Sequence, residues 1–188
     1  MIRSFLAIEL PRTIQKKIEE IQGDLKLSHA DVRWGSPEKI HLTLKFFGNI
    51  EELKIEPIVK SIEGPIQTTA PFPLRVRGMG AFPHLKNPRV IWMGLTNGKE
   101  NVISLQQRLE VLLEKMGFQA EDRPFHPHLT LGRVKSNRGR EELVGRMEKY
   151  REEEFGDFQV ETVIFFKSDL RPSGPIYTPL REIKLGGS

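Results

Sequence analysis

The 188-residue chain contains no cysteine. That absence excludes disulfide bonds and thiolate chemistry, and it fits a protein of the reducing cytoplasm, which is the location we expect. No apolar run approaches the roughly 20 residues of a membrane-spanning helix, so we expect no membrane association. The first ten residues become charged too early for a secretory signal peptide and are typical of a β-strand.

Several familiar catalytic signatures are also missing. The chain has no Gly-x-Ser-x-Gly sequence for a serine nucleophile and no glycine-rich loop of the kind that binds nucleoside triphosphates. It also lacks the His-Glu-x-x-His and cysteine-rich ligand sets of common zinc sites. We therefore expect neither a cofactor nor a metal, although His41, His126 and His128 leave a histidine metal site open as an alternative.

One tetrapeptide occurs twice, as His41-Leu42-Thr43-Leu44 and as His128-Leu129-Thr130-Leu131. With only five histidines and eight threonines in the chain, random placement gives roughly 0.2 His-x-Thr sequences, so two complete copies are informative. Side chains alternate between the two faces of a β-strand, so each copy places His and Thr on one face and both leucines on the other. The alternative is an ordinary strand pair whose polar face meets solvent.

The two motifs lie 128 − 41 = 87 residues apart, within two similar stretches of sequence. Each stretch predicts the order β-α-β-α-β, which indicates a tandem duplication over approximately residues 3–80 and 89–167. The predicted elements are strands 4–9 and 89–95, helices 11–26 and 100–116, the motif strands, amphipathic segments that stop at Gly64-Pro65 and near Gly156, and strands 72–79 and 157–167. A further strand is predicted at 176–185, followed by a flexible tail at 186–188.

The duplication predicts an α+β fold of one bilobal domain, residues 1–188. Each of two pseudo-twofold-related lobes would be a mainly antiparallel sheet with two outer helices, and a central cleft would separate the inner faces. Equivalent strands would then face each other across the axis. That arrangement would bring His41 and His128 into one cleft.

Two histidines in one cleft can supply an acid and a base, because an imidazole with a pKa near 6.5 is found in either protonation state around neutrality. The hydroxyls of Thr43 and Thr130 can hydrogen-bond an anion held between them, and phosphoryl oxygens fit that description.

Lys45 and Arg133 lie close enough in sequence to add positive charge to this site. Strict alternation places Lys45 on the His41 face, but it places Arg133 on the face opposite His128. Arg133 reaches the site only if the strand ends or bulges near Gly132.

The paired motifs resemble those of the 2H phosphoesterase superfamily, and within it the RNA 2′,3′-cyclic phosphodiesterases, also called 2′-5′ RNA ligases. The resemblance covers nearly the whole chain and has no departure at the motif positions. The segments that resemble this family, besides the motifs, are 3–10, Trp34, 45–48, 80–83, 88–92 and 126–133.

The resemblance implies metal-independent hydrolysis of a 2′,3′-cyclic phosphate at an RNA end to a 2′-phosphate, and reversal with a 5′-hydroxyl end to form a 2′-5′ linkage. It implies that His41 is the proton donor to the leaving 3′ oxygen and that His128 is the proton acceptor that activates water. Thr43, Thr130 and Arg133 would bind the phosphate.

RNA ends that carry a 2′,3′-cyclic phosphate are the expected partners, with tRNA halves as one candidate, and no obligate protein partner is expected. The net charge of +4 and the pI of about 9.4 favour a polyanionic ligand. Phe82 is either a platform that stacks on a base or a core residue. Two other functions remain open: an RNA-end-binding module without turnover, and a phosphodiesterase for small cyclic nucleotides or 2′-5′ oligonucleotides.

Overall fold

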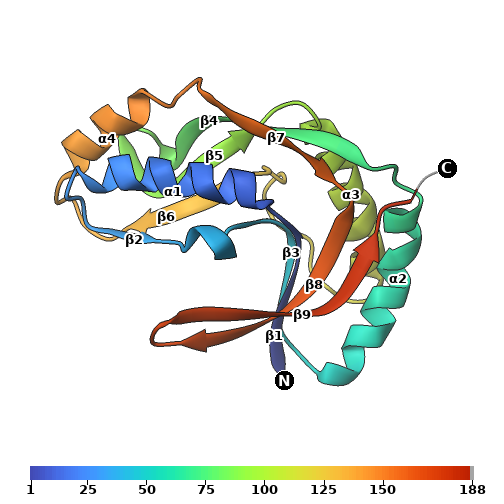
Figure 1. The fold of residues 1–188 in the computed structure, drawn as a ribbon. Helices are drawn as coiled ribbons and strands as arrows, with labels where there is room; N and C mark the ends of the chain where they lie inside the picture. The colour runs from blue at the N-terminus through green and yellow to red at the C-terminus, as the bar shows by residue number, and fades with distance from the viewer. Residues whose placement is uncertain (187–188) are drawn as a thin grey trace.

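Two antiparallel β-sheets carry the fold in the computed structural model, which describes residues 1–186 (Figure 1). Sheet A has the strand order β3-β1-β8-β9, and sheet B has the order β2-β6-β5-β4-β7. The strands of sheet A are β1 (Ile2–Glu9), β3 (His41–Ile50), β8 (Thr162–Arg171) and β9 (Gly174–Lys184). Those of sheet B are β2 (Val32–Trp34), β4 (Phe72–His84), β5 (Asn87–Leu95), β6 (Leu129–Val134) and β7 (Glu154–Val160).

Two helices cover the outer face of each sheet: α2 and α3 lie against sheet A, and α1 and α4 lie against sheet B (Figure 1). The helices are α1 (Arg12–Lys26), α2 (Ile55–Gln67), α3 (Lys99–Lys115) and α4 (Arg140–Glu148), and the short 3-10 helices are η1 (Pro37–Lys39) and η2 (Glu52–Lys54). Their apolar stripes are buried, as Ile14, Ile18 and Leu25 of α1 illustrate. The expected α+β fold with two lobes is confirmed.

Each lobe, however, contains strands from both halves of the sequence. Strand β4 ends the first half and pairs with β5 of the second half, while β8 of the second half pairs with β1 of the first. The prediction that each half would build its own lobe was therefore wrong. The predicted strand 157–167 is in fact β7 and β8, which meet at Glu161 and belong to different sheets.

Smaller boundaries also differ from the prediction. Helix α2 passes Gly64-Pro65 and ends at Gln67, since a proline in the last turn removes only one helical hydrogen bond. Strand β2 lies between the predicted helix 11–26 and the first motif strand, where no strand was predicted. Gly186, predicted as part of a flexible tail, donates its amide to the carbonyl of Thr69 at 3.1 Å, and the rest of that tail lies outside the described residues.

Most buried apolar side chains form one core between the sheets' outer faces and the helices. A second, smaller cluster lies on the inner face of sheet A and consists of Phe5, Ala7, Ile164 and Phe166, with Tyr177 packed against it. Within the described part of the chain, none of the helices combines the length and apolar character that crossing a bilayer requires.

Candidate active site

Both motif histidines are oriented by the same local hydrogen bond. The Nδ1–H of His41 donates to the carbonyl of Lys39 at 2.9 Å, and the Nδ1–H of His128 donates to the carbonyl of His126 at 2.6 Å. A carbonyl oxygen can only accept, so Nδ1 carries the hydrogen in each ring. Nε2 is therefore the atom of each imidazole that can accept or donate a proton to a ligand.

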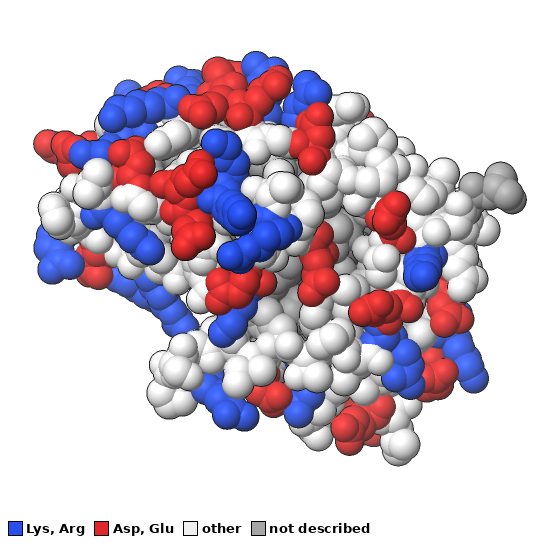
Figure 2. Space-filling view, viewed as in Figure 1, with Lys and Arg blue, Asp and Glu red and all other residues white. Residues whose placement is uncertain are grey.

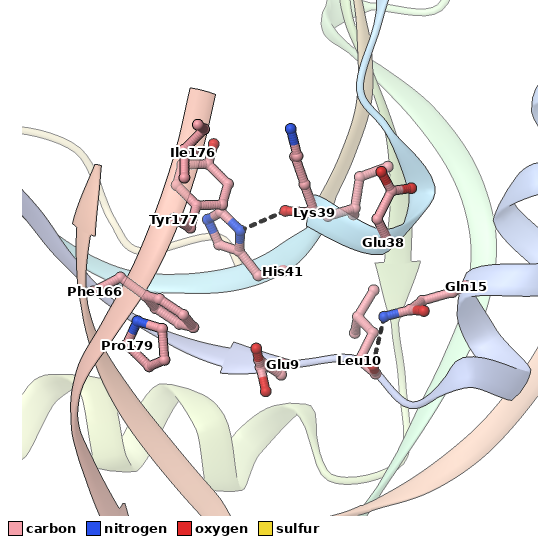
Figure 3. A pocket seen from close by; sticks show the side chains of 11 residues that line it. Glu9, Leu10, Gln15, Glu38, Lys39, His41, Phe166, Ile176, Tyr177 and Pro179 are labelled. Carbon is pink, nitrogen blue, oxygen red and sulfur yellow. Dashed lines mark hydrogen bonds between the residues drawn. The ribbon is translucent and has the colours of Figure 1, made fainter. Parts of the chain in front are cut away.

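Aromatic side chains of sheet A surround His41, which is the first residue of β3. Its ring stacks on Phe5 with centroids 4.6 Å apart and meets the edge of Tyr177 at 5.2 Å. Figure 3 shows the ring beside Tyr177, with the bond to the Lys39 carbonyl on its other side. Burial lowers the pKa of His41, while the bond to Lys39 acts weakly in the opposite direction.

A cavity of about 210 Å³ opens beside His41 (Figure 3). Apolar and charged groups line it together: the rings of Phe166 and Tyr177 form part of the wall, and the side chains of Glu9 and Lys39 approach from the ends of neighbouring elements. The cavity is large enough for part of a nucleotide-sized ligand to lie next to the imidazole.

His128 lies directly before β6 and has different neighbours. The ring of Phe82 stands edge-on to it, with centroids 5.0 Å apart and planes at 89°. Burial lowers the pKa of His128, and the positive charge of Arg133 lowers it further, against the raising effect of the bond to His126. Phe82 is partly buried and also lies 5.4 Å from Trp92, so it forms part of the wall beside His128.

A β-bulge follows the threonine in the first motif. Ala7 pairs with Thr43 and Leu6 pairs with Lys45, so Leu44 is the extra residue. Both Leu44 and Lys45 are consequently buried. The prediction that Lys45 faces the His41 site was wrong: its Nζ binds the carboxylate of Glu110 in α3 and donates to the carbonyl of Gln119 at 2.7 Å.

The second motif has the same bulge at the equivalent position. Trp92 pairs with Thr130 and Ile91 pairs with Gly132, so Leu131 is the extra residue. The shift places Arg133 on the same face as Thr130. This is the bulge near Gly132 that the sequence analysis required for Arg133 to reach the site. Gly132 points to the opposite face, where a Cβ would come within 2.8 Å of Val32.

Thr43 and Thr130 are half-buried on the inner faces of their sheets, opposite Ala7 and Trp92 respectively. Among residues 1–186, no protein group hydrogen-bonds to either hydroxyl. Both remain available to a ligand between the two motif strands, which approach each other in the fold.

His126 places its ring against Trp92 at 5.4 Å and lies 6.1 Å from His128, centroid to centroid. Within the described residues, no group of three or more His, Cys, Asp or Glu side chains is arranged to hold a metal ion.

A sequence model of the 2′-5′ RNA ligase superfamily matches residues 10–172. The chain belongs to this superfamily. The family resemblance inferred from the paired motifs is thereby confirmed.

Two archaeal relatives bear the name RNA 2′,3′-cyclic phosphodiesterase. The Methanothermobacter thermautotrophicus protein is 38% identical over 98% of this chain and 99% of its own length. The Methanocaldococcus jannaschii protein is 34% identical over 96% and 99%.

Solved structures agree with this membership of the 2′-5′ RNA ligase superfamily. TT0787 of Thermus thermophilus superposes with a TM-score of 0.83 at 28% identity, over all of both chains. Escherichia coli LigT, solved in complex with 3′-AMP, superposes with a TM-score of 0.76 at 24% identity over 98% of each chain, which supports the fold.

Sequence reasoning missed Phe5, Tyr177 and Trp92, which lie within or beside the sites of the two histidines. All three are in strands, where an inward-facing aromatic residue looks like an ordinary core residue. Only the alternation of Phe5 with Ala7, on the face opposite Leu6, hinted at a second apolar surface.

Proposed function

We propose that this protein hydrolyses 2′,3′-cyclic phosphate ends of RNA to 2′-phosphates by acid/base catalysis between His41 and His128. The observation that carries the proposal is the matched pair of Nδ1–H bonds to the carbonyls of Lys39 and His126, which leave the same nitrogen free on both rings. Binding RNA alone does not require two titratable groups oriented in this way. The names of the two archaeal relatives support the same reaction.

In the proposed reaction, neutral His128 accepts a proton from water at Nε2 as the water oxygen bonds to phosphorus. The bond from phosphorus to the 3′ oxygen breaks, and protonated His41 donates the Nε2 proton to that leaving oxygen. Burial is the main cause that lowers the pKa of both histidines, so the roles of donor and acceptor are taken from the family resemblance.

The phosphate would lie between the hydroxyls of Thr43 and Thr130, with Arg133 neutralising its charge. Phe82, half-buried beside His128, would be the ring on which a base stacks. If a 5′-hydroxyl end takes the place of water, the same proton transfers form a 2′-5′ linkage. Each step moves protons between side chains and substrate, so the proposal requires no metal or cofactor.

The test is incubation with a short RNA that ends in a 2′,3′-cyclic phosphate, without metal or ATP. We expect a 2′-phosphate product, and we expect EDTA to leave the rate unchanged. A 3′-phosphate product would contradict the roles assigned to the two ribose oxygens. Tight binding of an intact cyclic phosphate would instead favour an RNA-end-binding module.

A further inference from the structure

Two arginines lie directly opposite each other at the edge of sheet B. Strand β2 pairs with β6 so that Arg33 faces Arg133, one residue from the pair of Trp34 with Gly132. Cross-strand partners project to the same face of a sheet, and like charges in that relation repel each other. Since Arg133 is on the inner face with Thr130, Arg33 is there too, while Val32 and Trp34 pack against the core on the other face.

No carboxylate neutralises this pair. Among the ion pairs formed by residues 1–186, none involves Arg33, Arg133 or the neighbouring Arg3. Adjacent guanidinium groups without acidic partners are the usual protein chemistry for binding phosphate groups, because each can donate two parallel hydrogen bonds.

Tyr177 of β9 connects these arginines to His41. Its ring is nearly perpendicular to the His41 imidazole, with centroids 5.2 Å apart. Burial raises the pKa of Tyr177, and the positive charges of Arg3 and Arg33 act in the opposite direction. Arg3 alternates along β1 with Phe5 and Ala7, so it belongs to the inner face of sheet A, as Arg33 belongs to the inner face of sheet B.

The surface has a notch at this place. Figure 2 shows it between the lobe of sheet B and the projecting β8–β9 hairpin, with Lys and Arg side chains along its upper rim. Arg133 is on β6, the strand that begins directly after His128. Arg33 is on the neighbouring strand β2, at the edge of the sheet. A chain of phosphates leaving the histidine pair would meet Arg133 first and Arg33 next.

We infer that Arg33, assisted by Arg3, binds the phosphodiester that precedes the cyclic phosphate, and so makes the enzyme prefer oligonucleotide ends to nucleoside 2′,3′-cyclic phosphates. The inference rests on the proposed function and adds the substrate class to it. A nucleoside cyclic phosphate has no group for this site, whereas an RNA end or a 5′-phosphorylated nucleotide has one.

The experiment compares uridine 2′,3′-cyclic phosphate, its 5′-phosphorylated form and the dinucleotide UpU that ends in a 2′,3′-cyclic phosphate. We expect kcat/KM to be about tenfold higher for the two substrates that carry the extra phosphate, the range of one charge-assisted hydrogen bond. Arg33→Gln should remove most of that advantage and change the uridine value less than about twofold. It should also weaken the salt dependence of kcat/KM for the dinucleotide, because one charge–charge contact is lost.

Arg151→Gln is the matched control, since Arg151 is exposed in the turn after α4 and its ion pair is with Glu148 at 3.8 Å. It should leave the preference intact. Arg33→Lys keeps the charge but cannot donate two parallel hydrogen bonds, so it should retain part of the preference. If it does, the loss in Arg33→Gln reflects charge and not misfolding.

Three results would overturn the inference. In the first, Arg33→Gln lowers kcat/KM equally for all three substrates. In the second, it lowers none. In the third, the dinucleotide alone is preferred, which would assign the effect to the second base. If the unmodified enzyme hydrolyses none of the three, the proposed function itself is wrong.

Discussion

The inner faces of the two sheets share one backbone plan and carry different side chains. The bulged residues, Leu44 and Leu131, lie 87 residues apart, as the motifs do. The cross-strand row that follows each bulge differs in character: it is Phe46, Phe5 and Phe166 in sheet A, and Arg133, Val90 and Phe82 in sheet B.

The cross-strand row before each bulge differs in the same way. In sheet A this row contains Thr43, Ala7 and Ile164, and in sheet B it contains Thr130, Trp92 and Gly80. The indole of Trp92 lies so close to Gly80 that a Cβ there would overlap it. The shared backbone presents His and Thr in the same way twice, while the divergent rows put Phe5 against His41 in sheet A and a cation on the inner face of sheet B.

The first way to test this comparison is to remove each histidine. His41→Ala and His128→Ala should each lower kcat on an RNA 2′,3′-cyclic phosphate by about 10²–10⁴-fold, the usual cost of losing one proton-transfer group. Circular dichroism should show that both variants fold. Unchanged turnover in both would contradict the proposed pair. A loss in only one variant would mean that the other histidine is not catalytic.

The residue directly after each motif gives a second test of the difference between the sheets. This residue is Lys45 after the first motif and Gly132 after the second. Glu110→Ala would leave the buried Lys45 ammonium with only a carbonyl partner, and it should lower the free energy of unfolding by about 3 kcal/mol in urea denaturation. Glu20→Ala, which breaks the exposed pair with Lys17, is the control and should have little effect.

The combined variant Lys45→Met/Glu110→Leu should recover most of that stability, because it replaces the ion pair by apolar groups of similar size. All of these variants should keep their kcat at temperatures where they are folded. A lasting loss of kcat in Lys45→Met/Glu110→Leu would show that Lys45 does act in the site.

The smallest expected effect concerns pH. The pKa values of His41 and His128 both lie below 6.5, so the bell-shaped profile of kcat/KM should have its maximum on the acid side of that value. Arg133→Gln removes a charge that lowers the pKa of His128, and the maximum should move to higher pH by less than about one unit. Phe46→Ala, the equivalent change in sheet A, should not move it; an equal shift in both variants would refute the asymmetry.

Much of the fold could be read from local patterns, and the failures have identifiable causes. The stripe of α1 and the polar face of each motif follow from the spacing of apolar residues along the chain. The strand at 157–167 was misread because apolar residues recur on both sides of Glu161, and only pairing shows that the two parts join different sheets. Strand β2 is too short for its alternation to stand out, so Arg33 went unnoticed.

The sequence by itself determined that two His-Thr faces would exist and that their leucines would be buried, because alternation is a property of a single strand. The tertiary structure decided that Arg133 lies on the same face as the threonine of its motif and that Lys45 does not. A bulge forms where two neighbouring strands differ by one residue in their register, so it depends on the partner strand as much as on the motif. That pairing placed Lys45 against Glu110 and Arg133 on the same face as Thr130, and it gave two nearly identical motifs chemically different surroundings.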